Sequence, residues 1–116
     1  MNKDHKLYKI RLGVNETLKV NIVQRNRKMD LMDGKKIYVL IADRIVNEND
    51  ETIGSYIYRS RCMVIHLRRK GRELFETNKI FRDKYYRCLI ALKELLPYEQ
   101  KLEINKLING KCKISF

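Results

Sequence analysis

The stretch from Arg59 to Arg72 contains the residue types best suited to binding an anion. It lies within a segment that has no Asp or Glu between Glu51 and Glu73. Guanidinium groups stay charged at neutral pH and match the geometry of phosphate oxygens. The candidate nucleic-acid-binding residues of this stretch are Arg59, Arg61, Arg68, Arg69, Lys70 and Arg72. The pattern therefore predicts contacts with a phosphate backbone.

Other residues extend this candidate site on both sides. Tyr56 and Tyr58 lie just upstream, and tyrosine rings stack on exposed bases. A second basic group is expected on the same surface and consists of Arg25, Arg27, Lys28, Lys35 and Lys36. The alternative interpretation is that these charges form an ordinary solvated surface without a ligand. Charged residues at the end of a strand can serve only to protect a sheet edge from pairing.

The overall charge favours a polyanionic partner. The 116 residues include 26 Lys and Arg against 14 Asp and Glu, a formal net charge of +12, which attracts polyanions over a Debye length. The leading hypothesis is a small non-catalytic protein that binds DNA or RNA with low sequence specificity. The alternative is a regulatory or inhibitory protein of a phage or mobile element, which binds an acidic surface of a host protein.

Enzymatic and metal-dependent functions have little support in the sequence. The five glycines form neither a Walker loop nor a dinucleotide-binding fingerprint. His5 and His66 are the only histidines, and neither has Cys or carboxylate neighbours at a ligand spacing. We expect no catalytic residues, no metal and no cofactor. The three cysteines are expected to be buried thiols: Cys62, Cys88 and Cys112.

The first two thirds of the chain would have to position these cations, and its patterns predict strands. Apolar and polar residues alternate in residues 7–12 and 18–22, with a turn expected at 13–16, so the two segments resemble a hairpin. Asp33-Gly34 is a strong turn signal. Further strands are predicted for residues 36–46 and 52–60, and residues 61–69 are either a fifth strand or a bent continuation of the fourth.

The pattern changes to a helical period after Asn78, which is a suitable N-cap. One apolar helical face is predicted from Phe81, Tyr85, Cys88, Leu89, Leu92 and Leu96. Pro97 should end this helix and begin a second helix that runs to about Leu107 or Ile108. Residues 112–116 alternate and predict a short final strand.

This order of elements predicts one α+β domain over residues 1–116. We expect an antiparallel sheet of about five N-terminal strands, then two helices and a short C-terminal strand. A small five-stranded barrel with a helical extension is the main alternative. Edge strands could pair two copies into a homodimer. No apolar run approaches the ~20 residues of a membrane span, and no signal peptide is expected, so the predicted location is the cytoplasm, or the host cytoplasm for a viral protein.

Overall fold

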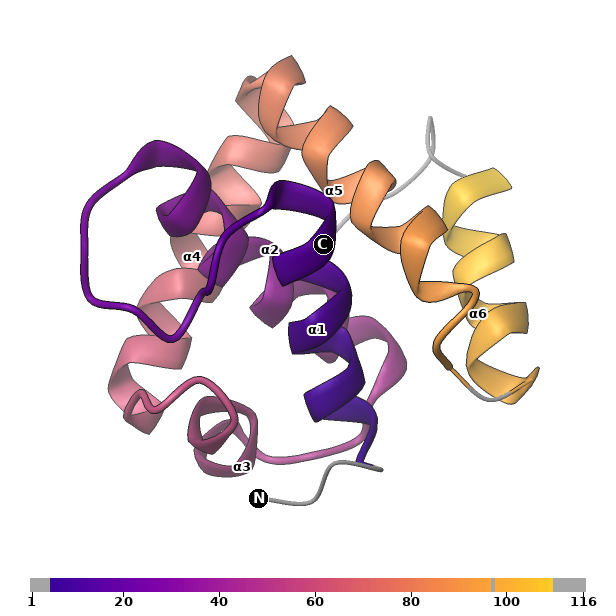
Figure 1. Cartoon of the computed structure of the whole chain (residues 1–116), viewed down its shortest axis with the longest axis horizontal. Helices are drawn as coiled ribbons and strands as arrows, with labels where there is room; N and C mark the ends of the chain where they lie inside the picture. Colours follow the sequence, from indigo (N-terminus) through magenta and orange to yellow (C-terminus); the bar gives the residue numbers. More distant parts are fainter. Residues whose placement is uncertain (1–4, 97, 110–116) are drawn as a thin grey trace.

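A computed structural model describes residues 5–96 and 98–109, and this part of the chain contains six helices and no strand. The predicted α+β fold is therefore wrong, and so is the barrel alternative. The sheet edges that the α+β prediction offers for dimerisation do not exist among these residues. The helices, shown in Figure 1, are α1 (Lys6–Leu18), α2 (Met29–Ile45), α3 (Asp50–Ser55), α4 (Arg61–Thr77), α5 (Lys79–Leu92) and α6 (Tyr98–Asn109).

Helix α1 occupies the segment predicted to be a hairpin. Leu7, Ile10, Val14 and Leu18 are all buried, and their spacing of three and four residues places them on one face of a helix. The alternation that suggested a strand extends over only six residues. Because the helical stripe covers the whole of α1, it buries more apolar surface than the shorter alternating pattern would.

Two glycines that resembled turn residues lie inside helices, where they permit close packing. A Cβ on Gly13 of α1 would lie 2.5 Å from Leu92 Cδ2 of α5. A Cβ on Gly34 of α2 would lie 2.7 Å from Ile22 Cγ2. The turns predicted at residues 13–16 and at Asp33-Gly34 are therefore wrong, because both segments continue a helix.

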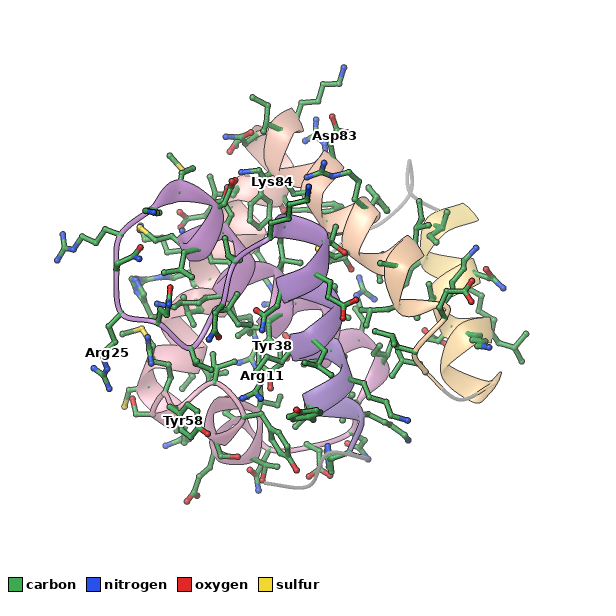
Figure 2. The ribbon with its side chains drawn as sticks, in the orientation of Figure 1. Arg11, Arg25, Tyr38, Tyr58, Asp83 and Lys84 are labelled. Atoms are coloured by element: carbon green, nitrogen blue, oxygen red, sulfur yellow. The ribbon has the colours of Figure 1, made fainter. Side chains whose placement is uncertain are left out.

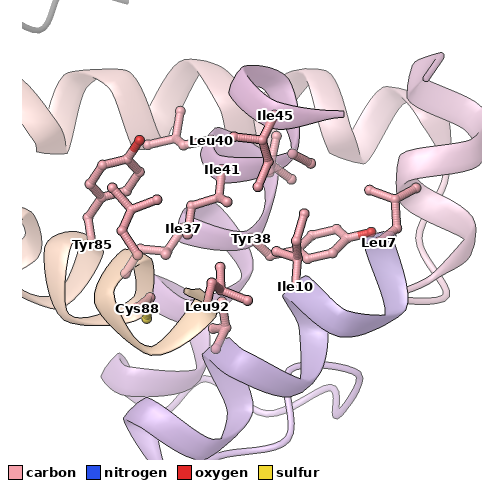
Figure 3. Close-up of a cluster of buried hydrophobic side chains, with 14 of the residues drawn as sticks. Leu7, Ile10, Ile37, Tyr38, Leu40, Ile41, Ile45, Tyr85, Cys88 and Leu92 are labelled. Atoms are coloured by element: carbon pink, nitrogen blue, oxygen red, sulfur yellow. The ribbon is translucent and has the colours of Figure 1, made fainter. Parts of the chain in front are cut away.

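Helix α2 forms the centre of the fold. Residues 37–42 have no exposed surface, and α1, α4 and α5 pack around them (Figure 3). The prediction that this segment is buried is confirmed, but its assignment as a strand is wrong. A short continuous apolar run has no period that distinguishes a buried strand from a buried helix.

Helices α3 and α4 replace the fourth and fifth predicted strands. The side chain of Asn49 accepts a hydrogen bond from Thr52 N at the start of α3, and Ser60 Oγ accepts one from Met63 N at the start of α4. These caps satisfy amide groups that have no partner within the helix. The buried face of α4 comprises Val64, Leu67, Gly71 and Phe75.

Helix α5 confirms the helical prediction for the last third of the chain. Asn78 Oδ1 accepts a hydrogen bond of 3.0 Å from Phe81 N, and all six residues of the predicted apolar face are buried. The helix ends at Leu92, four residues earlier than predicted, and α6 follows as the second predicted helix. Pro97, Cys112 and the final strand predicted at 112–116 lie outside the described residues.

The burial of the cysteines is only partly as predicted. Cys88 is buried in the core, and this burial raises the pKa of its thiol to about 12. Cys62 is exposed on α4, against expectation, because the helix turns this position away from the core. None of the described helices is both long and apolar enough to cross a lipid bilayer.

Candidate anion-binding groove

A surface hollow of about 600 Å³ brings together basic residues from four parts of the chain. It lies between the loop that joins α1 to α2, the N-terminal half of α2, the segment before α4, and one face of α4. We call this hollow the basic groove. Its lining residues are Arg25, Asn26, Arg27, Met32, Lys35, Lys36, Arg59, Met63, His66, Leu67 and Lys70.

Helical geometry explains why these residues share one surface. The four lining residues of α4, from Met63 to Lys70, are spaced at i, i+3, i+4 and i+7, which is a single helix face. Gly71 lets α4 approach α2 closely, because a Cβ there would lie 3.1 Å from Leu40 and 3.4 Å from Lys36 Cβ. The close packing of α2 on α4 thus brings Lys36 and Lys70 to the lining of one hollow.

The lining of the basic groove carries six cationic side chains and no carboxylate: Arg25, Arg27, Lys35, Lys36, Arg59 and Lys70. Within the described part of the chain, Lys70 is the one groove cation with an ion pair, at 3.7 Å from the exposed Glu73. An exposed pair of this kind is weak. The groove therefore retains nearly all of its positive charge.

Lys35 is the most unusual of these cations because it is 9% exposed. Its ammonium group has neither a hydrogen bond nor an ion pair with any residue that the structure describes. Burial lowers the pKa of Lys35, and the positive charges of Arg59 and Arg25 lower it further. Lys35 lines the hollow, so its charge is available to a ligand bound there.

Arg59 shapes the groove through backbone contacts. Its Nη1 donates hydrogen bonds to the carbonyl oxygens of Ile57 at 3.2 Å and Tyr58 at 3.0 Å. Its Nη2 donates to Val23 at 3.5 Å and Gln24 at 3.0 Å. These partners are neutral, so the charge of Arg59 is not cancelled. The side chain thereby holds the loop that carries Arg25 and Arg27, and Arg25 projects outward from that loop (Figure 2).

Two of the predicted arginines lie beside carboxylates, and Arg68 is the one that is neutralised. Arg68 pairs with both Asp43 and Asp50, and all three side chains are largely buried. Arg72 lies 3.8 Å from Asp43. The hydrogen bond from Arg68 lowers the pKa of Asp50. These residues connect α2, α3 and α4, so their role is in the packing of the helices rather than in the groove.

The other predicted residues are not part of the groove lining. Tyr56 is buried and stacks on His5 with 4.9 Å between ring centroids, so its ring is not accessible to a base. Tyr58 is 60% exposed, in a left-handed backbone conformation, directly before Arg59. Arg61 and Arg69 are exposed on α4. Lys28 lines a separate hollow at the start of α2.

Sequence reasoning missed the uncharged part of the groove. Met32, Met63 and Leu67 form apolar surface among the cations, and His66 lies beside them. The spacing of residues 63, 66, 67 and 70 places them on one face of a helix and could have identified this part of the groove. The assignment of the segment as a strand concealed that spacing. His66 Nδ1 lies 3.5 Å from Arg69 Nη2.

The described residues contain no group of three or more His, Cys, Asp or Glu side chains that could hold a metal ion. Comparisons with known protein families, with curated proteins and with solved structures found no match for this chain. A functional assignment therefore depends on the geometry and charge of the basic groove.

Proposed function

We propose that this chain is a small non-catalytic nucleic-acid-binding protein whose binding surface is the basic groove. The observation that carries the proposal is the convergence of six cations from four segments on one hollow whose lining has no carboxylate. Such a concentration of positive charge is the electrostatic signature of phosphate binding.

The proposed binding has low sequence specificity. The cationic lining residues are suited to phosphate contacts, which set position and orientation but do not read bases. Lys35 contributes a partly desolvated positive charge, and Arg25 and Arg27 of the loop contribute exposed positive charges. We expect DNA and RNA of unrelated sequence to bind with similar affinities.

Fluorescence anisotropy with labelled oligonucleotides tests this proposal over a range of salt concentrations. If about four phosphates are neutralised, log K should fall against log salt with a slope of about −3 on single strands and about −4 on duplex DNA. Replacing Arg25 and Lys36 by Gln should weaken binding at low salt by about tenfold or more. A lack of binding at low salt would contradict the proposal.

A charge-matched control distinguishes the groove from the net charge of the molecule. Lys79 and Lys106 are exposed on α5 and α6, away from the groove lining. Replacing both by Gln removes the same number of charges as the groove variant. Equal weakening by both double variants would show that binding depends on net charge alone.

Binding to an acidic protein is the alternative partner class, and the same titration can detect it. Polyglutamate presents carboxylates without phosphates or bases. Tight binding of polyglutamate together with no binding of oligonucleotides would support the alternative, since basic surfaces also speed association with acidic proteins.

A further inference from the structure

The basic groove combines charge with exposed apolar surface. Met32 and Met63 are 38% and 40% exposed, and both line the same hollow as Lys35 and Arg59. Leu67, which is largely buried, lies beneath them in the lining, and we call these three side chains the methionine floor. Contacts with phosphates alone would leave the floor in water, where it gains no burial free energy.

We infer that the basic groove binds an unpaired strand, with phosphates against its cations and at least one base against the methionine floor. This inference rests on the proposed function and names its substrate class. In a duplex the faces of the bases are stacked on one another, so the surface presented to a groove of cations is mainly sugar and phosphate. In a single strand the base faces are available for contact with a protein.

The chemistry of the methionine floor fits a base. Thioether side chains are flexible and polarisable, and they make favourable contacts with aromatic rings. Two methionines from different helices can adjust to any base, which agrees with low sequence specificity. His66 adds a planar ring to the lining of the same hollow.

Lys35 supplies the second observation that points to a ligand in the groove. The side chain of Lys35 is about nine-tenths buried and lines the hollow, and its ammonium group has no hydrogen-bond or ion-pair partner among the described residues. Arg25 and Arg59 are close enough to lower its pKa electrostatically. A phosphate placed among these three cations would relieve their mutual repulsion and leave the adjoining base within reach of the floor.

Three oligonucleotides of equal length test this inference by anisotropy at low salt. They are a single strand, its duplex, and a single strand in which the central nucleotides are abasic. We expect the intact single strand to bind about tenfold more tightly than either other probe, since only its bases are available for thioether–aromatic contacts with the floor. The abasic strand carries the same phosphates, so it isolates the contribution of the bases.

Substitutions in the floor sharpen the test. M63A should weaken binding of the intact single strand about three- to tenfold and leave binding of the abasic strand unchanged, since it removes only contacts with the bases. M29A is the matched control, because Met29 is 70% exposed and does not line the groove. Unchanged binding of the abasic strand also shows that M63A is folded.

The outcomes separate this inference from the proposed function. Equal or tighter binding of the duplex, or equal binding of the abasic and intact strands, would overturn the single-strand inference while nucleic-acid binding stands. Weakening of the intact strand by M29A as large as that by M63A would also overturn it. Failure of all three probes to bind would remove the proposed function itself.

Discussion

The guanidinium Nη2 of Arg59 donates a hydrogen bond of 3.0 Å to the backbone carbonyl oxygen of Gln24, 35 residues earlier in the chain. This bond joins the segment before α4 to the loop between α1 and α2. The loop carries Arg25 and Arg27, so the position of two groove cations depends on a third. Arg59 thus lies close to Arg25 and Arg27 because its guanidinium group is hydrogen-bonded to neutral carbonyl groups of their loop.

Arg59→Lys should separate the geometry of this side chain from its charge. Lysine keeps the positive charge but cannot span four carbonyl oxygens with a planar fork. We expect the free energy of unfolding to fall by about 1–2 kcal/mol, because hydrogen bonds to four backbone carbonyl groups are lost or weakened. Oligonucleotide affinity should also fall several-fold as the loop loosens. Chemical denaturation and anisotropy measure the two effects, and an affinity equal to that of the wild type would contradict the positioning role.

Lys35→Met should stabilise the protein and weaken its binding. The substitution removes a partly desolvated charge that has no ion pair among the described residues, and it keeps most of the volume of a largely buried side chain. Stability should rise by about 0.5–2 kcal/mol, as at other sites where function opposes stability. The control is Lys79→Met at the exposed start of α5, which should change the free energy of unfolding and the oligonucleotide affinity little.

The stability difference between Lys35→Met and the wild type should depend on pH. The folded-state pKa of Lys35 lies below its ordinary value of 10.5, so its charged form destabilises the folded protein at neutral pH. As pH rises through the folded pKa toward 10.5, the group loses its proton and this destabilisation disappears. Denaturation curves should show that the difference in free energy of unfolding between the variant and the wild type narrows from neutral to alkaline pH. A difference that widens would contradict the lowered pKa of Lys35.

Arg68→Met should destabilise the packing of α2, α3 and α4. It leaves Asp43 and Asp50 close together without their shared cation, and we expect a loss of about 2–4 kcal/mol near neutral pH. The pKa of Asp50 is lowered in the folded protein, so this stabilisation is present above the ordinary value of 3.8 and is lost as pH falls through the folded value. The acid limb of the stability curve should therefore flatten in the variant.

A neighbouring arginine provides the control for that experiment. Arg69 is exposed and has no ion pair among the described side chains, so Arg69→Met should change stability by less than about 0.5 kcal/mol. Urea denaturation at several pH values measures both variants. Equal destabilisation by the two substitutions would show that the Arg68 carboxylate pairs contribute nothing specific.

Gly13→Ala tests the close approach of α1 to α5. Alanine favours a helix over glycine by about 1 kcal/mol, but its Cβ would meet Leu92 at 2.5 Å in the core. We expect overpacking to outweigh propensity and to give a net loss of about 1–2 kcal/mol. In a Leu92→Ala background the clash is absent, so the same substitution should become stabilising. Additive effects in this double-mutant cycle would contradict the contact.

The sequence predicted part of the candidate site for a reason that does not depend on secondary structure. Arg59 and Lys70 were identified from charge and from the absence of nearby acids, and the cations of residues 25–36 were identified from charge. Six of them line the groove. Arg68 and Arg72 could not be distinguished from these by composition, because Asp43 and Asp50 reach them only through the packing of separate helices.

By itself, the sequence determined the excess of positive charge, the burial of residues 37–42 and the apolar face of α5, because each depends on residue type or on a long, clear period. Only the tertiary structure decided between helix and strand in the first two thirds of the chain. Short apolar runs there satisfy both periods, and two glycines serve helix packing instead of turns. Which cations remain unpaired was likewise decided by packing, since ion pairs form across helices that are distant in sequence.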